Sequence, residues 1–357
     1  MAKPKNILVA PLNWGLGHAT RCIPIINELL LNGFTPILAS DGNALALLKK
    51  EFPNLEHITL PSYNIKYAKK GRFFKLKLAL NIPKLIIAVQ KEKKLVNKLV
   101  KEKDITGIIS DNRFGVYHHS IPSIYITHQL NVLSGVTTKL SSKIHQRIIR
   151  KFDECWIPDF KSSTNFSGKL SQAFDSDFCL KYIGILSRFK RKNTPIIYDY
   201  LIILSGPEPQ RTLLENKLLS ELKHSAKKIL FIKGVIESEQ KTTTTNNTTH
   251  YNYMTSFELE HAINSSDMVI ARSGYTTIMD LAKMNKKAFF IPTPGQFEQI
   301  YLAERLQKQR YAPYCKQDDF CIKKLKEVDV YNGLSITDEE ALSFSDLFNC
   351  FQSKRKL

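Results

Sequence analysis

The stretch NILVAPLNWGLGHATRCIPIINELL, residues 6–30, decides the fold class of this chain. It begins with a short apolar run, passes through a glycine-rich turn and continues with apolar residues at helical spacing. A short buried strand followed directly by an amphipathic helix is half of a parallel βαβ unit. We therefore predict a strand at residues 6–11, a helix at residues 20–32 and a parallel α/β sheet.

The alternation of strands and helices continues and then restarts in the second half of the chain. Strands are predicted at 35–40, 105–110, 123–127 and 154–158, and again at 200–205, 229–233, 268–271 and 288–292. Helices are predicted at 43–51, 211–224, 275–284 and 298–309. A single core stops growing near ~250–300 residues. Two consecutive arrays therefore predict an α/β protein with two Rossmann-like domains that face each other across a cleft.

The boundary between these domains is expected in a polar segment, and we place it between residues 175 and 176. Residues 1–175 then form an N-terminal domain, and residues 176–357 form a C-terminal domain. Thr337 and Glu340 form a capping box for a last helix, which can pack back on the N-terminal domain. The polar, low-complexity segment Lys241–His250 is interpreted as a surface loop.

Composition limits the class of protein. The hydrophobic fraction of 43% and the charged fraction of 24% are ordinary for a globular protein. Six scattered cysteines without a CxxC pair favour free thiols in a reducing cytosol. No apolar run has the length of a signal core or a membrane-spanning helix, so we expect a soluble, cytoplasmic protein. The net charge of +19 favours an anionic partner.

The first candidate site is the turn between the first strand and the first helix. Asn13, Gly15 and Gly17 belong to it, and glycines allow the backbone to approach a ligand closely. His18 follows, and an imidazole can act as a base near neutral pH. Asp111, at the end of the strand predicted at 105–110, is the second candidate for that base. The plainer interpretation is a tight turn with a polar histidine.

A second and a third candidate site are turns of the second half, each after a strand and before a helix. Arg272, Ser273 and Gly274 open one helix, where Ser273 can cap and the amides can bind phosphate. Asp280 lies further along that helix, and a carboxylate can accept two hydrogen bonds from ribose hydroxyls. Gln299 follows the last predicted strand and can bind sugar hydroxyls. The plainer interpretation is a capped helix with a solvated aspartate.

Taken together, these segments resemble the MurG-like enzymes of glycosyltransferase family 28, which have the GT-B fold. Five motifs of the family are matched in order: Gly17–His18, His128 with Asn131, Gly184 with Arg188, Arg272–Gly274 with Asp280, and Pro292 with Gln299. The resemblance covers the chain to about Ala312. It implies transfer of N-acetylglucosamine or a related hexose from a UDP-sugar to an acceptor that can be lipid-linked, in cell-envelope glycan biosynthesis.

The resemblance also implies residue roles. His18 or Asp111 would be the catalytic base. Acceptor binding would fall to Asn13, Gly15, Gly17, His128 and Asn131. Donor binding would fall to Arg188, Ser205, Gly206, Arg272, Ser273, Gly274, Asp280 and Gln299. No cofactor or metal is expected, because amides, a helix dipole and arginine can meet the charge of the departing UDP.

The sequence departs from the family pattern in the loop after the first strand of the second half. Where the family has a glycine- and serine-rich phosphate loop, this chain has Ser205–Gly206–Pro207–Glu208–Pro209. The two prolines remove amide donors, and Glu208 would repel phosphate. Gln129 and Ile300 also replace residues of the family pattern, which suggests a different sugar or acceptor. A metal-binding Asp175–x–Asp177 pair is considered and set aside, because no strand precedes it.

The segment Lys66–Lys103 is rich in lysine and apolar residues, and such a segment can bind an anionic membrane surface. A peripheral position on the inner face of the membrane is thus one interpretation, and a solvated helix face is the other. A nucleotide-sugar hydrolase or epimerase on the same scaffold remains the alternative function. Nucleic-acid binding has only the charge in its favour, since no recognition motif supports it.

Overall fold

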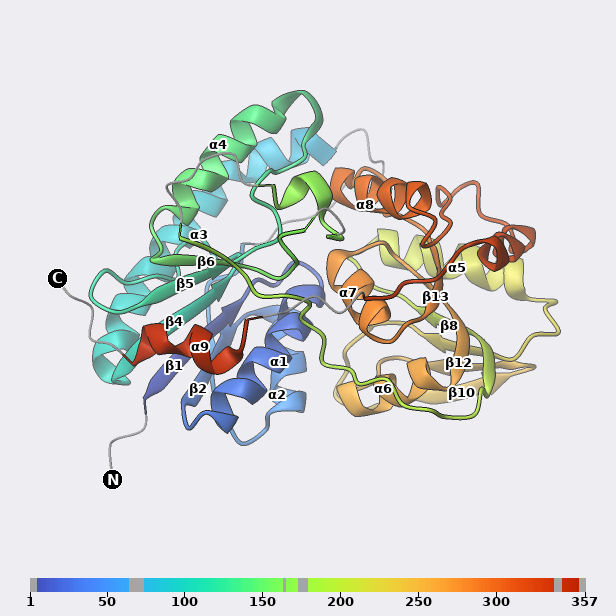
Figure 1. Cartoon of the computed structure of the whole chain (residues 1–357), viewed down its shortest axis with the longest axis horizontal. Coiled ribbons are helices and arrows are strands. Elements are labelled where there is room, and N and C mark those ends of the chain that lie inside the picture. The colour runs from blue at the N-terminus through green and yellow to red at the C-terminus, as the bar shows by residue number, and fades with distance from the viewer. Residues whose placement is uncertain (1–4, 64–73, 163–164, 173–178, 337–341, 353–357) are drawn as a thin grey trace. The chain divides into compact units, whose positions relative to one another are not determined.

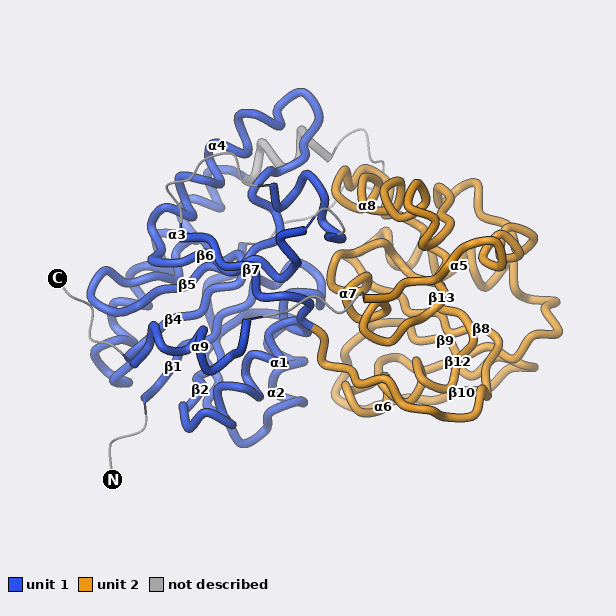
Figure 2. Tube along the Cα trace, viewed as in Figure 1, with its two compact units in different colours: residues 1–65, 79–186, 339–357 blue, residues 66–78, 187–338 orange. Residues whose placement is uncertain are grey.

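The computed structural model describes residues 5–63, 74–162, 165–172, 179–336 and 342–352 (Figure 1). The chain divides into two compact units, each described here by itself (Figure 2). The first unit comprises residues 1–65, 79–186 and 339–357, and the second comprises residues 66–78 and 187–338. The division after Leu186 lies beyond the predicted boundary at residue 175, because β7 still pairs with the first sheet.

The first unit is built on a parallel sheet with the order β3-β2-β1-β4-β5-β6-β7. Its strands are β1 (Asn6–Pro11), β2 (Thr35–Ser40), β3 (Glu56–Thr59), β4 (Ile105–Asp111), β5 (Ser123–Ile126), β6 (Glu154–Ile157) and β7 (Leu180–Tyr182). Its helices are α1 (Gly17–Leu31), α2 (Gly42–Glu51), α3 (Phe74–Glu102), α4 (Thr138–Ile149) and α9 (Phe344–Phe348), with short 3₁₀ turns at Gly135–Thr137, Gly168–Leu170 and Asn349–Phe351. The strand order reverses between β1 and β4, where such sheets bind their ligands.

One face of this sheet is covered by α3. Val96 and Leu99 of α3 pack against Leu8, Ile37 and Ile108 of the sheet. The last described segment also packs on the first unit. Phe348 and Phe351 stack against Phe34 and Trp156. Position 107 must be glycine because a Cβ atom there would lie 2.3 Å from the Phe351 ring. The capping box predicted at Thr337–Glu340 lies outside the described residues, and α9 is instead capped by the side chain of Ser343.

The second unit is built on a mostly parallel sheet with the order β10-β11-β9-β8-β12-β13. Its strands are β8 (Tyr198–Ile203), β9 (Ile229–Ile232), β10 (Thr242–Thr245), β11 (Thr248–Tyr251), β12 (Ser266–Ala271) and β13 (Lys287–Phe290). Its helices are α5 (Gln210–Leu222), α6 (Ser256–Asn264), α7 (Tyr275–Lys283) and α8 (Phe297–Lys308), with a 3₁₀ segment at Ile322–Val330. The order reverses between β8 and β12.

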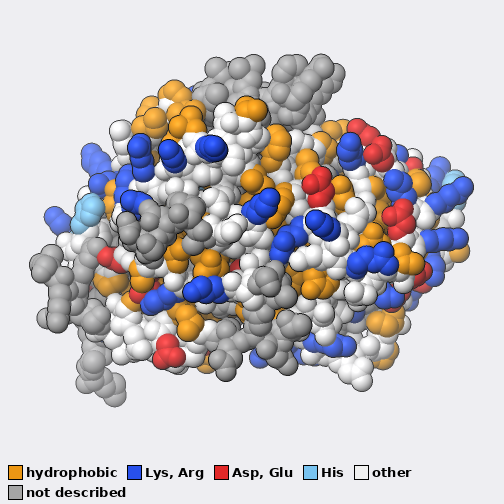
Figure 3. Space-filling model, turned by 45° about the horizontal axis from the view of Figure 1, so that its top comes forward, with side chains coloured by type: hydrophobic (Ala, Val, Ile, Leu, Met, Phe, Trp, Pro, Cys, Tyr) orange, Lys and Arg blue, Asp and Glu red, His pale blue; other side chains and the backbone are white. Residues whose placement is uncertain are grey.

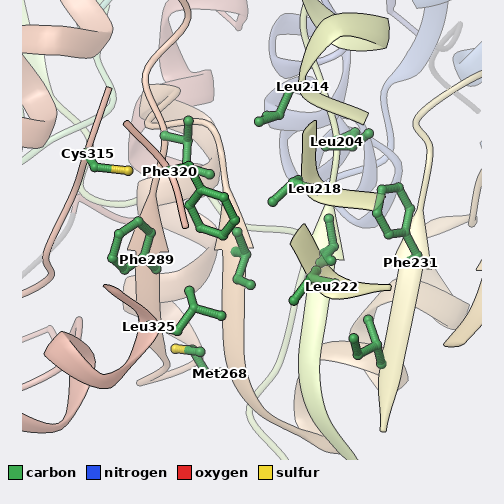
Figure 4. Packing of buried hydrophobic residues seen from close by; sticks show 14 of the residues in the cluster. Leu204, Leu214, Leu218, Leu222, Phe231, Met268, Phe289, Cys315, Phe320 and Leu325 are labelled. Atoms are coloured by element: carbon green, nitrogen blue, oxygen red, sulfur yellow. The ribbon is translucent and has the colours of Figure 1, made fainter. Parts of the chain in front are cut away.

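The core of the second unit includes apolar residues that recur at helical spacing along α5. Leu214, Leu218 and Leu222 of α5 recur every four residues, so they share one face of the helix. They pack toward Phe231 in a cluster that continues to Phe289 and Phe320 (Figure 4). This packing supports the ends of β8, β12 and β13, from which the loops of the candidate site emerge.

The predicted α/β fold with two parallel-type sheets is confirmed. The predicted strands and helices named above differ from the observed bounds by at most three residues. The interpretation of Lys241–His250 as a loop is wrong. Residues 242–245 and 248–251 form an antiparallel hairpin, and β11 also pairs in parallel with β9. Threonine favours extended backbone, and Asn246 accepts the left-handed turn with φ 52°.

Candidate functional site

Two candidate residues of the first unit lie together at the switch point of its sheet. β1 and β4 are neighbours with Pro11 opposite Asp111, so the ends of both strands lie at one edge. Because α1 begins at Gly17, His18 is in its first turn. The His18 Nδ1 atom lies 2.8 Å from the Asp111 Oδ1 atom. His18 and Asp111 were predicted as alternatives for one role, and the structure joins them in a His–Asp pair.

Asp111 is held as a carboxylate inside the unit. Its side chain is 0% exposed, and Arg21 binds both of its oxygens. Burial favours the protonated form, but the Arg21 guanidinium and His18 together hold the pKa of Asp111 well below its usual range. The side chain of His18 remains 17% exposed. The pair therefore presents one accessible imidazole that is supported by a buried negative charge.

The glycines of the first turn have distinct roles. Gly15 has φ +80°, and a Cβ atom there would meet nothing within 4 Å, so backbone conformation and not crowding requires glycine. Gly17 begins α1, whose N-cap residue Leu16 makes no side-chain cap. The turn therefore leads directly into the positive end of a helix dipole.

The other predicted acceptor residues are engaged within the fold. Asn13 donates to Asp41 at 3.2 Å and accepts from the amide of Ala44 at 3.3 Å, so it fastens the turn to the start of α2. Asn131 donates to the carbonyls of Lys169 and Gln172 at 2.8 and 2.9 Å. Both asparagines hold segments of the unit together.

His128 is a buried member of the same cluster. Its side chain is among the buried polar groups, and Arg21 Nη1 lies 3.0 Å from its Nδ1 atom. His128 thus reaches the His18–Asp111 pair through Arg21, a residue that is not among those predicted from the sequence. The available signal was its position three residues after His18, one helical turn away.

Three loops of the second unit gather where β8, β12 and β13 end, because these strands are neighbours. The Oγ atom of Ser273 donates to the backbone oxygen of Gln299 at 2.8 Å. The Oε1 atom of Gln299 accepts from the amide of Thr293 at 2.8 Å. Gly206, next to Ser205 and with φ +100°, has only the Thr293 Oγ1 atom within 4 Å of an added Cβ, at 3.9 Å. The prediction that Ser273 caps α7 is wrong, since Gly274 is the N-cap residue and the helix has no side-chain cap.

Arg272 is buried and hydrogen-bonded within the second unit. The side chain is 1% exposed, and its guanidinium donates to the carbonyls of Ile291, Pro292 and Gln210 and to the side chain of Gln317. Burial lowers its pKa to about 9. The contact with a departing phosphate stays a prediction, and in this structure Arg272 connects three loops.

Asp280 is buried and not a solvated residue. It is 8% exposed, and its Oδ1 atom accepts from the Ser187 hydroxyl at 2.7 Å. Burial raises its pKa to about 6, although the Arg188 guanidinium acts in the opposite direction. Arg188 itself lies over the Phe189 ring, 4.8 Å from the centroid. A buried carboxylate whose pKa is raised by the loss of its solvation is typical of a functional position. Ser187 was missed because a lone serine carries no pattern.

The acidic residue of the loop that departs from the family pattern, Glu208, is paired with neighbouring residues. Glu208 accepts from Arg211 Nε at 2.7 Å and from the amide of Thr212 at 3.3 Å. Its charge is therefore paired with Arg211 at the start of α5, which weakens the predicted repulsion of phosphate. Pro207 and Pro209 still lack amide hydrogens.

The described residues contain no group of three or more His, Cys, Asp and Glu side chains that could hold a metal ion. The pair Asp175 and Asp177 lies outside these residues. Within the same described part of the chain, no helix is both long and apolar enough to cross a lipid bilayer.

Residues 207–331 match the glycosyltransferase family 28 C-terminal domain. The chain is 25% identical over 248 residues to a UDP-N-acetylglucosamine--N-acetylmuramyl-(pentapeptide) pyrophosphoryl-undecaprenol N-acetylglucosamine transferase of Clostridium kluyveri, which covers 66% of this chain and 67% of the relative. It is 23% identical to an uncharacterized glycosyltransferase of Methanosarcina acetivorans, over 90% of this chain and 89% of the relative.

Solved structures with the same fold include glycosyltransferases. MurG of Acinetobacter baumannii superposes with a TM-score of 0.52 and 13% identity, over 98% of this chain and 99% of the other. The glycotransferase of kitacinnamycin superposes with a TM-score of 0.58 and 13% identity, over 92% and 90% of the two chains. At these identities the likeness establishes the fold.

Proposed function

From the premise that this chain is a glycosyltransferase with a family 28 C-terminal domain on a GT-B fold, we propose that it transfers a hexose from a UDP-sugar to the hydroxyl of an acceptor. N-acetylglucosamine is the first candidate for the sugar, and a polyprenyl-phosphate-linked glycan is the first candidate for the acceptor. We assign acceptor activation to the first unit and donor binding to the second. The proposal depends on one observation, the His18–Asp111 pair.

In the proposed reaction, His18 accepts the proton of the acceptor hydroxyl. A hydroxyl attacks the anomeric carbon only as it loses its proton, and a positioned base contributes roughly 10²–10⁴-fold. Asp111, 2.8 Å from His18 Nδ1, orients the ring and stabilises the imidazolium as it forms. The bond between the anomeric carbon and the UDP oxygen breaks as the new glycosidic bond forms, and UDP leaves as the anion.

In the second unit, backbone amides would bind the anionic donor. The start of α7 after Gly274 has no side-chain cap and presents the positive end of a helix dipole. Gly206 leaves space above its backbone for close approach of the diphosphate. Asp280 would accept hydrogen bonds from the ribose, and Gln299, already fixed by Thr293, would contact the sugar. Arg188 supplies positive charge near Asp280.

The decisive experiment follows UDP release from UDP-N-acetylglucosamine, with and without a polyprenyl-diphosphate-linked acceptor. Transfer predicts slow release alone and release that rises with acceptor concentration, with a matching glycosylated product. Release at the full rate without acceptor would instead indicate a nucleotide-sugar hydrolase, and conversion of the sugar without UDP release would indicate an epimerase. Repeating the measurement with GDP- and dTDP-sugars tests the nucleotide.

The acceptor side of the proposal includes a membrane surface, because two helices of the first unit expose apolar side chains beside basic ones. The six exposed apolar residues are Ile82, Ile86 and Ile87 of α3 and Val136, Leu140 and Ile144 of α4 and its preceding turn, each at least 50% exposed. Lys139, Lys143 and Arg147 lie on the same helix as Leu140. Figure 3 shows apolar and basic side chains side by side over this region. Residues 66–73 of the predicted basic segment lie outside the described residues.

Apolar side chains that insert among lipids and basic ones that attract anionic headgroups would hold the protein peripherally. Co-sedimentation with phosphatidylglycerol vesicles at low salt tests this. The variant Leu140→Ser/Ile144→Ser should lose binding, whereas Leu213→Ser/Leu219→Ser, which changes the exposed leucines of α5, should retain it. Equal binding by both variants, or no binding by the unmodified protein, would exclude this surface.

A further inference from the structure

A single buried guanidinium connects the polar groups of the first site. Arg21 is 1% exposed and lies on α1, one turn after His18. Its Nε and Nη2 atoms bind the two oxygens of Asp111. Its Nη1 atom lies 3.0 Å from His128 Nδ1, and its Nη2 atom also lies 2.9 Å from His18 Nδ1. Two histidines and one aspartate therefore share one arginine.

This contact defines the state of His128. An arginine has only donors, so the Nδ1 atom of His128 must be the acceptor. Its single hydrogen then stands on Nε2, and the neutral ring can only donate from that side. His128 is consequently a hydrogen-bond donor and is unsuited to take a proton through Nε2. Of the two histidines in the cluster, only His18 can carry its hydrogen on either ring nitrogen.

Both tautomers of His18 are possible because Asp111 and Arg21 require different protonation states of its Nδ1 atom. Asp111 Oδ1, 2.8 Å away, can only accept from His18 Nδ1, whereas Arg21 Nη2, 2.9 Å away, can only donate to it. If Nδ1 carries the hydrogen, it binds Asp111 and the Nε2 lone pair is free to act as a base. If Nδ1 lacks the hydrogen, it binds Arg21 and Nε2 cannot take a proton.

We propose that Arg21 is a positioning residue that competes with Asp111 for His18 Nδ1 and so sets the fraction of His18 in its basic tautomer. The effect of Arg21 on catalysis rests on the proposed function, whereas its contacts with His18 and Asp111 do not. Besides His18, the charged and titratable groups in this cluster, among the described residues, are Arg21, Asp111, His128, the Tyr125 hydroxyl and the thiol of Cys22, which lies 3.7 Å from Asp111 Oδ2. Arg21 acts through His18 and needs no contact with a substrate.

The test is the ¹⁵N spectrum of the histidine rings in the uniformly labelled full chain above pH 8, without substrate. The His18 signals are assigned by their loss in His18→Ala. We expect the unmodified protein to show averaged shifts at both His18 nitrogens, or a hydrogen on Nε2. Arg21→Met should move His18 to a hydrogen on Nδ1 alone, and Asp111→Asn should move it to a hydrogen on Nε2. Arg21→Lys, which keeps the charge but loses the planar fork, should lie between.

A spectrum of the unmodified protein with the hydrogen on Nδ1 alone overturns the proposal, even if Arg21→Met fails to fold. An unchanged His18 tautomer in a folded Arg21→Met protein overturns it as well. That result would reduce Arg21 to a counter-ion of Asp111. Neither result depends on catalysis, so failure of the inference is distinct from failure of the proposed transferase activity.

If the transfer assay succeeds, a second readout applies. Arg21→Met removes the group that competes with Asp111 for His18 Nδ1, so kcat at its plateau should rise while KM for the donor is unchanged. A purely structural role would instead lower kcat at every pH by the same factor. Such a uniform loss would count against the proposal.

Discussion

The two units place their candidate residues at the same point of similar sheets, but they use different chemistry there. In the first unit the end of β4 carries Asp111, which is buried with Arg21 as a charged pair. In the second unit the equivalent edge carries Arg272, whose guanidinium binds carbonyls and an amide and no carboxylate. Buried ionic partners suit a group that must move a proton. Loops that present backbone amides, as proposed for the second unit, suit an anionic ligand that must bind and then dissociate.

The contrast extends beyond the site residues. A second buried ionic group in the first unit joins Arg113, 0% exposed, to Asp41 at 2.9 Å and to Glu92 at 2.7 Å. Burial raises the pKa of Glu92, although Arg113 opposes this, and Tyr63 donates to it at 2.6 Å. These contacts fix α3 beside the first turn, since Asn13 also binds Asp41. The first unit thus contains two buried ionic groups in addition to its apolar core.

The largest expected effect separates catalysis from binding. His18→Ala should lower kcat for transfer by roughly 10²–10⁴-fold, because the base is removed. The Kd for UDP should stay within about twofold, since no donor residue is changed. Stopped assays and calorimetric titration with UDP measure the two quantities. His119→Ala, at an exposed histidine, is the matched control. If His18→Ala weakens UDP binding as much as it lowers kcat, the division of roles between the units is wrong.

The next effect is acid instability of the first unit. Burial lowers the pKa of His145, on α4, from 6.5 to about 4. The native state then binds fewer protons than the unfolded chain between these values, so the free energy of unfolding falls as the pH is lowered through this window, by roughly 3 kcal/mol. Both tryptophans, Trp14 and Trp156, belong to the first unit, so their fluorescence reports it.

His145→Gln can still bond to the Tyr125 hydroxyl, which lies 3.0 Å from His145 Nε2, but does not titrate. Urea titrations followed by tryptophan fluorescence at pH 7 and pH 5 should show a smaller loss of stability in this variant than in the unmodified protein. An identical loss in both proteins would show that His145 is not responsible.

A carboxylate in the second unit should give the opposite sign. The pKa of Asp280 is raised from 3.8 to about 6, so the native state binds more protons than the unfolded chain in that range. Stability is therefore lost as the pH rises through the window, and Asp280→Asn should regain roughly 3 kcal/mol at pH 7. The same variant should weaken UDP binding about tenfold, because a charged acceptor is lost. Thermal unfolding and UDP titration test the two parts, with Asp267→Asn, an exposed position on β12, as control.

If Asp280→Asn leaves both stability and UDP affinity unchanged, the carboxylate is neither strained nor a ligand. A gain in stability without a loss of affinity would make Asp280 a structural residue only. If Asp280 is a functional residue, its replacement should both raise stability and lower UDP affinity, because functional positions are often destabilising.

The sequence was most informative where the period of apolar residues was clear. The buried strands and the helix of Leu214, Leu218 and Leu222 could be predicted because burial demands one residue class at fixed spacing. The hairpin at 242–251 could not, because its exposed threonines have no apolar partner to reveal the pairing. His18 and Asp111 could be identified from the ends of strands. Their 2.8 Å contact and its link through Arg21 arise from the pairing of β1 with β4, which local sequence does not encode.

The smallest expected effect concerns the loop in which this chain departs from its family pattern. Glu208 would repel a diphosphate if its charge were free, but it is paired with Arg211 at 2.7 Å and binds the amide of Thr212. Its side chain is 56% exposed, so solvent screens it further. Glu208→Gln should therefore change UDP affinity by less than about threefold. A tenfold gain would mean that the carboxylate faces the donor, and the second unit would then carry an unpaired charge at its binding edge.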